Sequence, residues 1–235
     1  MVAAGCAGMA LHVGVVEMRF LLAFFFVALL GCGSVGFHAS LQHEAQMADE
    51  LPMLWAAMTT TFILLENKDR PVPVVGRWLA PALIAHAVLT SCATFFASGT
   101  AQFVLFHVSF GSAEFFSLYQ IYLIYRRHVD AAPAAPDTLA IALCWRRGIA
   151  SYGVGLFCWQ FDLHSCWVLA VWWPRVSGLP NPQLHAWWHV LVSSGFYLLI
   201  TLAAYDRLLL LGKRPRLRWV AGVLPFVSDD AAKDT

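Results

Sequence analysis

Five polar residues lie at the ends of long apolar runs in this sequence, and their types could support catalysis. Ser34 and His38 end one run, Asp49 begins the next, and His185 and His189 begin the last. Polar side chains are costly inside a bilayer, so each is a functional candidate by default. Three histidines leave one coordination position open on a zinc ion, as a catalytic zinc site requires. We therefore predict a zinc site, with the carboxylate and the hydroxyl as its catalytic partners.

The spacing of these residues predicts that they meet at one level. Ser34 and His38 are four residues apart, and so are His185 and His189, so each pair projects from one face of its helix. Asp49 is expected to begin the next helix after a short return, at the same depth as His38. Three helices would thus bring metal ligands, a carboxylate and a hydroxyl together.

Simpler interpretations of the histidines exist. An isolated His-x-x-x-His pair on a helix is a weak signal, and histidines at helix ends in membrane proteins are often only interfacial. Two histidines could also ligate haem, but haem needs them on different helices and gives Asp49 no role. The combination of all five residues at one depth favours the metal site.

The composition is that of a polytopic membrane protein. The 235 residues are 60% hydrophobic and only 12% charged, whereas average proteins carry roughly 25% charged residues. We predict an all-α transmembrane bundle of six spans, preceded by Met1–Val16 as the remnant of a first transmembrane helix. The expected spans are residues 19–41, 51–66, 78–98, 101–125, 146–162 and 185–211.

The remaining segments are expected to connect or follow these spans. Asp130–Asp137 is rich in proline and alanine and predicts a linker. A short helix over Thr138–Trp145 is expected to lead into the fifth span. We predict a transmembrane domain over residues 1–211 and a polar, mostly solvated cytosolic tail over residues 212–235.

The distribution of basic residues predicts the orientation. Those near the span ends map to one side of the membrane, and only Arg175 maps to the other. Because basic residues prefer the cytosol, the C-terminus is predicted to be cytosolic. The segments 42–50 and 163–184, which flank the candidate site, would then face a lumen or the cell exterior. A formal net charge of +1 argues against nucleic acid as a partner.

Other ionisable residues are given supporting roles. Glu44, Glu50 and Asp162 could hold the metal ligands in place from the same side of the membrane. Glu114 lies within the fourth span and is predicted to form a hydrogen bond between helices. His12 is expected to be at the surface or at the interface.

Three strings carry a family resemblance. They are GCGSVGFHASLQHEAQMADELPM (Gly31–Met53), CWQFDLHSC (Cys158–Cys166) and PQLHAWWHVL (Pro182–Leu191). Their order and spacing resemble those of the alkaline ceramidases, and the resemblance covers nearly the whole chain. That family belongs to a superfamily that also includes lipid-sensing receptor-like proteins and GPI-anchor remodelling proteins.

The resemblance implies a seven-helix zinc hydrolase that cleaves the amide bond of ceramide into sphingosine and a fatty acid. His38, His185 and His189 would be the zinc ligands and Asp49 the general acid and base. Ser34 would stabilise the oxyanion or help to bind the water at the metal site. An endoplasmic reticulum or Golgi membrane is the expected location, with the active site lumenal. The alternatives are a GPI-anchor remodelling type of lipid hydrolase and a lipid-sensing receptor-like protein.

One departure from the family concerns calcium. Family members begin with an acidic segment that binds calcium, followed by a first transmembrane helix. This sequence has no Asp or Glu before Glu17, so the family's calcium site is expected to be absent from it. Either the sequence is truncated or it is a divergent six-helix member, and an inactive remnant is a further alternative.

Overall fold

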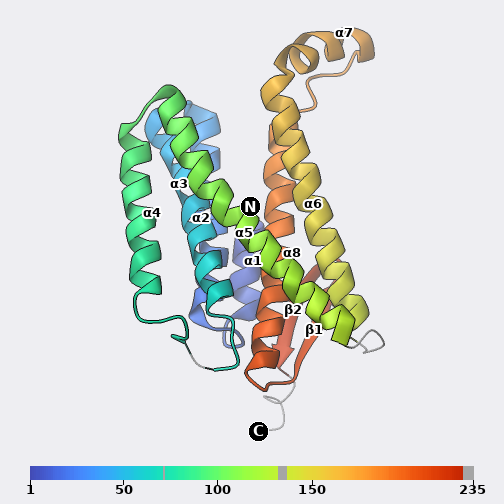
Figure 1. The fold of residues 1–235 in the computed structure, drawn as a ribbon. Coiled ribbons are helices and arrows are strands. Elements are labelled where there is room, and N and C mark those ends of the chain that lie inside the picture. Colours follow the sequence, from blue (N-terminus) through green and yellow to red (C-terminus); the bar gives the residue numbers. More distant parts are fainter. Residues whose placement is uncertain (71, 132–136, 230–235) are drawn as a thin grey trace.

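The computed structural model describes residues 1–70, 72–131 and 137–229 and is mostly helical (Figure 1). The elements in chain order are α1 (Val2–His12), α2 (Met18–Ser40), α3 (His43–Leu65), α4 (Leu79–Phe96), α5 (Gly99–Ala131), α6 (Thr138–His164), a π-helical turn (Val168–Trp172), α7 (Trp173–Ser177), α8 (Leu184–Leu210), β1 (Pro215–Val220) and β2 (Leu224–Asp229). We call the end of the bundle where α8 begins the upper end, and the end where α8 finishes the lower end.

Three of these helices are long and apolar enough to cross a membrane, namely α2, α4 and α8. A fourth span is possible if α6 and the segment Val168–Ser177, which bends away from it by 85°, are taken together. The predicted helical membrane bundle agrees with this finding. The long helices also lie close to the predicted ranges, but the number of six spans stays a prediction.

Three predicted boundaries were wrong. Helix α3 begins at His43, so Asp49 lies in its second turn rather than at its start. Helix α6 runs without interruption from Thr138, so no separate short helix precedes the fifth span. The segment 163–184 is not a simple loop, because it contains the π-helical turn and α7. The predicted linker lies mostly in residues 132–136, outside the described part.

The C-terminal segment also differs from the prediction, so the chain is not strictly all-α. Residues 215–229 form an antiparallel hairpin in which Pro215 pairs with Asp229 and Val220 with Leu224. Leu217 and Val227 are buried in the main apolar core, while Arg216 points outward. The alternation of apolar and basic residues in β1 has the period of a half-buried strand, which explains why this segment packs instead of remaining solvated.

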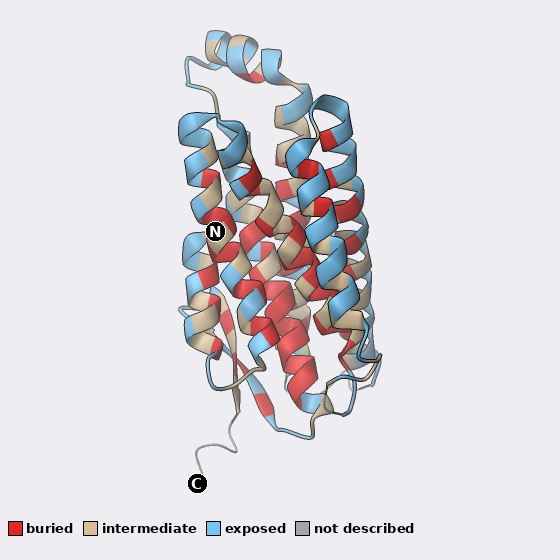
Figure 2. Cartoon of the chain, turned by 90° about the vertical axis from the view of Figure 1, so that its left-hand side faces the viewer, coloured by how far each residue is buried: buried red, intermediate tan, exposed pale blue. Residues whose placement is uncertain are grey.

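The core is built around α8, which packs most extensively against α6, while α2 packs against α3. Figure 1 shows α5 crossing diagonally in front of these pairs, with α4 at the outer edge of the bundle. Buried residues gather in the middle and lower part of the bundle (Figure 2). The upper end is consequently the more open part of the molecule.

Buried charged residues form ion pairs at the lower end of the bundle. Arg207 is only 1% exposed, and its Nη2 donates to Oε1 of Glu17 at 2.6 Å. The same carboxylate accepts a 2.6 Å hydrogen bond from Nε of Arg19. The neighbouring Asp206 accepts from Arg127 at 2.6 Å and pairs with Nε2 of His128 at 2.8 Å. These pairs join α8 to α5 and to the connection between α1 and α2.

His12 is fully buried, which contradicts the predicted surface position. Its Nδ1 lies 2.8 Å from the carbonyl oxygen of Gly8, and its Nε2 accepts the backbone N–H of Val227 at 3.3 Å. The ring also stacks on Phe24 with a centroid separation of 5.3 Å. His12 therefore joins α1 to the hairpin, a contact that local sequence patterns do not reveal.

Glu17 should make stability depend on pH. Burial alone would raise the pKa of Glu17, but the hydrogen bond from Arg207 and the charges of Arg19 and Arg207 lower it below the ordinary value of 4.5. A carboxylate with a lowered folded-state pKa stabilises the fold above its unfolded pKa, and this contribution is lost as the pH falls through the folded pKa. We expect Glu17→Gln to lower the Tm of the solubilised protein at neutral pH, with a difference that shrinks below about pH 4.5.

The matched control is Asp69→Asn, which removes a carboxylate that is 79% exposed and 3.9 Å from Arg70. Exposed pairs of this kind contribute little to stability, so the Tm should not change. A Glu17→Gln deficit of equal size at neutral and acidic pH would show that packing, not charge, accounts for the effect.

Candidate metal centre

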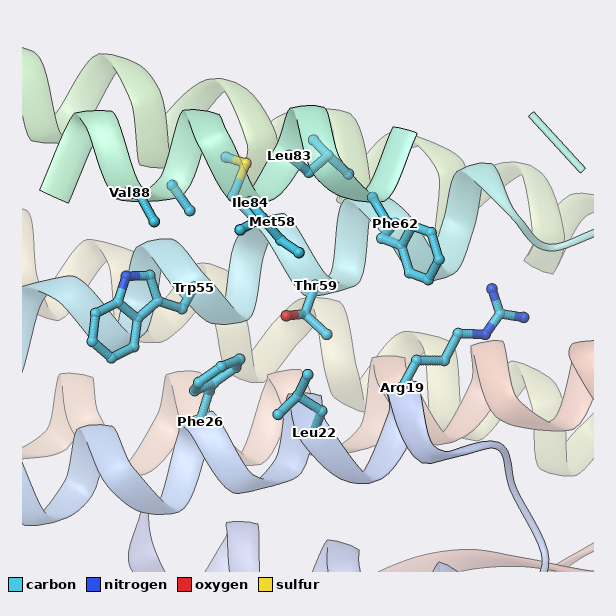
Figure 3. Close-up of a pocket in the computed structure, with 12 residues that line it drawn as sticks. Arg19, Leu22, Phe26, Trp55, Met58, Thr59, Phe62, Leu83, Ile84 and Val88 are labelled. Carbon is cyan, nitrogen blue, oxygen red and sulfur yellow. The ribbon is translucent and has the colours of Figure 1, made fainter. Parts of the chain in front are cut away.

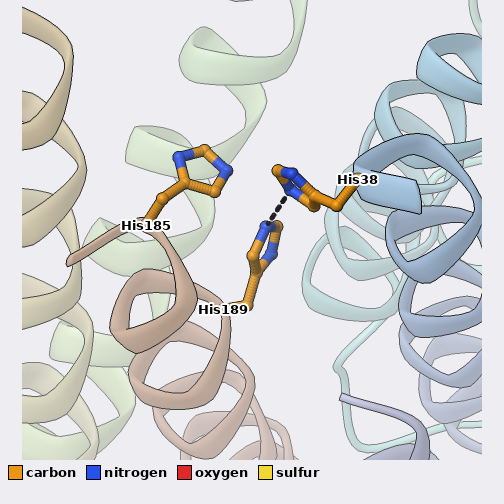
Figure 4. Close-up of side chains that lie close together, drawn as sticks. All are labelled: His38, His185 and His189. Carbon is orange, nitrogen blue, oxygen red and sulfur yellow. Dashed lines mark hydrogen bonds between the residues drawn. The ribbon is translucent and has the colours of Figure 1, made fainter. Parts of the chain in front are cut away.

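Three histidines from two helices point their rings toward one another at the upper end of the bundle (Figure 4). His38 lies in the last turn of α2, while His185 and His189 lie in the first two turns of α8. Each ring offers one ligand nitrogen, and these three nitrogens all lie within 4.8 Å of one another. The structure thus brings together the three histidines that the sequence analysis had singled out.

One separation in the cluster matches the spacing of two ligands on a small tetrahedral cation. Zinc–nitrogen bonds of 2.0–2.1 Å at tetrahedral angles place two ligand nitrogens about 3.3 Å apart. Nε2 of His38 lies 3.3 Å from Nε2 of His189. The centroid of the His185 ring is 4.9 Å from that of His38 and 4.8 Å from that of His189. A neutral imidazole has one ring nitrogen with a free lone pair. A cation placed between the three rings would accept one lone pair from each of them.

Ser34 and Asp49 lie directly beside this cluster. Oγ of Ser34 is 3.2 Å from Nε2 of His189, and the Asp49 carboxyl lies near the Ser34 hydroxyl. Both residues are only 7% exposed. Oδ1 of Asp49 is buried and has no hydrogen-bond partner within the described ranges. A carboxylate oxygen and a hydroxyl are therefore available one helical turn below His38.

Helices α2 and α3 approach each other very closely at this level. A Cβ atom on Gly33 would lie 1.9 Å from the carbonyl oxygen of Ala48 and 3.0 Å from the backbone nitrogen of Asp49. Only glycine permits such an approach, because any side chain would overlap the facing backbone. The contact explains why Ser34 and Asp49, which follow these two residues, are neighbours.

The predicted supporting carboxylates have different positions. Oδ2 of Asp162, in the last turn of α6, lies 3.9 Å from Nδ1 of His185. A carboxylate in this position can orient an imidazole toward a metal. Glu50 accepts a 2.7 Å hydrogen bond from Gln46, while Glu44 is exposed. Of the three, Asp162 is the one that lies against a histidine of the cluster.

The backbone beside the cluster adopts an unusual conformation at two points. Leu41, which caps the end of α2, has φ 55°, and Gln183, which caps the start of α8, has φ 53°. A left-handed conformation costs a residue with a side chain roughly 1–2 kcal/mol. These two turns directly follow α2 and directly precede α8, the two helices that carry the histidines.

A cavity of about 610 Å³ opens beside the cluster between α3, α5, α6 and α8. Asp49, His185 and His189 line its upper part, and Glu114 and Tyr152 line it deeper in the bundle. Its size is typical of a pocket for a small molecule or a lipid chain. Most of its wall is apolar, so a hydrocarbon chain could lie there with its polar end at the histidines.

A second cavity lies between α2, α3 and α4 (Figure 3). It measures about 390 Å³ and is lined by apolar side chains such as Phe26 and Trp55, with Arg19 near its lower end. It contains no histidine, cysteine or carboxylate among its lining residues. The second cavity therefore does not provide the chemistry that the histidine cluster offers.

The aromatic wall of the first cavity was not predicted from the sequence. Trp188 packs on Trp159 with a centroid separation of 5.6 Å, and His107 stacks on Trp159 at 5.5 Å. Periodicity alone does not distinguish aromatic residues that line a cavity from those that face lipid. Glu114 lines this cavity together with Tyr152 of α6, and its hydrogen bond between helices stays a prediction.

Comparisons with known proteins agree with the motifs. A family model described as Ceramidase matches residues 1–228. An alkaline ceramidase of Arabidopsis thaliana is 27% identical over 217 residues, which cover 92% of this chain and 77% of the relative. Alkaline ceramidase 3 of Mus musculus is 24% identical over 90% of this chain and 75% of its own length. An alkaline ceramidase of Saccharomyces cerevisiae is 29% identical over 83% of this chain and 64% of its own length.

The approach of α2 to α3 predicts a large effect for one added methyl group. Gly33→Ala places Cβ against the backbone of Ala48 and should force the helices apart. Overpacking of this kind typically costs about 1–3 kcal/mol. We expect a Tm lower by several degrees and a weaker affinity for added zinc, measured by titration of the metal-free protein.

The matched control is Gly36→Ala on the same helix, where an added Cβ meets nothing within 4 Å. Alanine is the better helix former by about 1 kcal/mol, so this variant should be neutral or slightly stabilised. Similar behaviour of the two variants would contradict a steric role for Gly33.

Proposed function

The chain belongs to the ceramidase family, and on that premise we propose that it is a zinc-dependent membrane hydrolase that cleaves the amide bond of ceramide. The products would be a sphingoid base and a free fatty acid. The observation that supports this proposal is the meeting of three histidines, a hydroxyl and a carboxylate at the mouth of an apolar cavity.

His38, His185 and His189 would hold the zinc ion through ring nitrogens, with Asp162 orienting His185. Zinc bound there would lower the pKa of a coordinated water to about 7 and polarise the amide carbonyl. Three protein ligands leave a coordination position for this chemistry, whereas a structural zinc site is closed by four.

Asp49 and Ser34 would move the protons and bind the reacting oxygen. The Asp49 carboxylate takes a proton from the attacking water as the new carbon–oxygen bond forms, and it returns that proton to the amine nitrogen as the carbon–nitrogen bond breaks. The Ser34 hydroxyl donates a hydrogen bond to the carbonyl oxygen as negative charge develops on it. The contact of Ser34 with both Asp49 and His189 supports this division of roles.

Three substitutions test the assignment. Asp49→Asn should abolish hydrolysis of ceramide but retain zinc, since it removes a base that is not a ligand. His185→Ala should lose both the metal and the activity. Ser34→Ala should retain zinc and slow turnover by about 100–1,000-fold, the usual effect of losing one oxyanion donor. Hydrolysis is measured in detergent micelles, and zinc by elemental analysis of the purified variants.

Glu50→Gln is the matched control, because Glu50 follows Asp49 on α3 and lines the same cavity. Its activity should stay close to that of the wild type. Equal zinc in the wild type and in His185→Ala would refute the ligand assignment. Cleavage of GPI-linked lipid esters in preference to ceramide would instead favour the GPI-anchor remodelling alternative.

We further propose a multi-pass orientation in an endoplasmic reticulum or Golgi membrane with the site in the lumen. The connection after α3, the end of α5 and the segment after α8 lie at the lower end and carry most of the basic residues, while Arg175 lies in α7 at the upper end (Figure 1). Basic residues concentrate on the cytosolic side of membrane proteins. This asymmetry supports a cytosolic lower end.

A glycosylation acceptor inserted after Gly178, beyond the end of α7, tests the orientation. We expect the tag to be glycosylated, because only the lumenal side meets the modifying enzymes. The same acceptor placed at Gly222 in the hairpin turn should remain unmodified. The reverse pattern would overturn the orientation without affecting the assignment of the metal ligands.

A further inference from the structure

Glu114 is an ionisable residue that the proposed reaction does not use. It lies midway along α5 and lines the cavity that reaches the histidines, among apolar neighbours such as Phe110, Phe115 and Leu118. A carboxyl group in an apolar part of a membrane protein is expensive, so its presence points to a functional role. Its location links that role to whatever occupies the cavity.

Tyr152 of α6 is the polar neighbour of Glu114. Both side chains line the same cavity, and Tyr152 is only 6% exposed. Trp188 and Val192 of α8 pack against the Tyr152 ring and hold it in place. A phenol supplies one hydrogen bond, but a carboxyl group can form several. Glu114 therefore retains hydrogen-bonding capacity that faces the cavity.

The pair lies deeper in the bundle than the metal centre. Tyr152 packs against Val192, and its backbone nitrogen would lie 3.0 Å from a Cβ atom on Gly195. These residues follow His189 on α8 by one to two turns, which corresponds to roughly 5–9 Å along the helix axis. The hydrogen-bonding groups thus lie a few carbon–carbon bonds away from the position of a scissile amide at the histidines.

The fatty acyl chain is the part of ceramide that would pass this pair. Its carbonyl carbon has to lie at the histidines, and the chain that follows is hydrocarbon, as is most of the cavity wall. The sphingoid base, in contrast, carries its hydroxyl groups next to the amide and keeps its polar end at the open mouth. An ordinary acyl chain would offer Glu114 only methylene groups.

We propose that Glu114 and Tyr152 form a specificity site for a hydroxyl group on the acyl chain, a few carbons from the amide. This inference rests on the proposed function and names its substrate class more closely. An acyl chain without a hydroxyl group shields the Glu114 carboxyl from water and offers it no hydrogen bond. A hydroxyl group on the chain would replace the hydrogen bond that water would otherwise provide. Sites that hydrogen-bond a substrate hydroxyl discriminate strongly against analogues that lack it.

The test is a series of ceramides with one sphingoid base and one acyl length. A single hydroxyl is placed at successive acyl positions, and the reference has none. We expect kcat/KM of the wild type to peak at one position, by about tenfold or more over the unsubstituted chain. Glu114→Leu should abolish this peak and bring the ratio close to one, with unsubstituted ceramide still hydrolysed.

Three further variants separate recognition from structure. Glu114→Gln keeps a polar amide and should retain most of the preference, while Tyr152→Phe should reduce it. Phe110→Leu changes the same cavity wall without removing a polar group, so the ratio should persist. The readout is the ratio of kcat/KM for the hydroxylated and the unsubstituted ceramide, which does not depend on how much of a variant is folded. If Glu114→Leu does not fold at all, Glu114→Gln and Tyr152→Phe still test the specificity site.

Two results would overturn the specificity site. One is a flat profile across all hydroxyl positions in a wild type whose hydrolysis is abolished by Asp49→Asn, which leaves the proposed function intact. The other is a peak that survives in Glu114→Leu or is unchanged in both milder variants. Absence of Asp49-dependent hydrolysis of every ceramide would refute the proposed function, and this inference with it.

Discussion

Helices α2 and α3 approach each other so closely at Gly33 and Ala48 that no side chain fits between them. This contact sets the distance between Ser34 and Asp49, the residues that follow. It also determines how far His38, one turn beyond Ser34, projects toward α8. The proposed reaction needs these side chains in a fixed arrangement, which tolerates only small errors in position. The absence of one methyl group is thus a condition for the whole arrangement.

The sequence was sufficient to find the cluster, because the four-residue spacing of Ser34 with His38 and of His185 with His189 survives any small error in helix ends. It was insufficient for features that depend on distant partners. The burial of His12 by Val227 and the packing of Leu217 into the core require knowledge of which segments meet. The position of Asp49 within α3 was missed because polar residues precede it, and these obscure the start of the helix.

Helix α8 runs from an open cavity at the upper end of the bundle to a tightly packed group of charged residues at the lower end. Its 27 residues begin near His185 and finish just beyond Arg207, a length of about 40 Å. At the lower end, buried ion pairs with Glu17 and Arg127 fix the helix to its neighbours. At the upper end, the same rigid helix presents two histidines to an open cavity. The ion pairs at the lower end thus stabilise the helix, while its upper end remains beside an open cavity.

The contact between His12 and Val227 has a consequence for how the protein is made. These residues are 215 positions apart, so the contact of α1 with β2 forms only when synthesis has passed Val227. A ribosome that adds about 5–20 residues per second needs tens of seconds or less to cover this distance. During that interval the imidazole of His12 can stack on Phe24 but lacks the hydrogen bond from the backbone N–H of Val227. The packing of α1 on α2 can therefore precede its contact with β2, which joins segments made far apart in time.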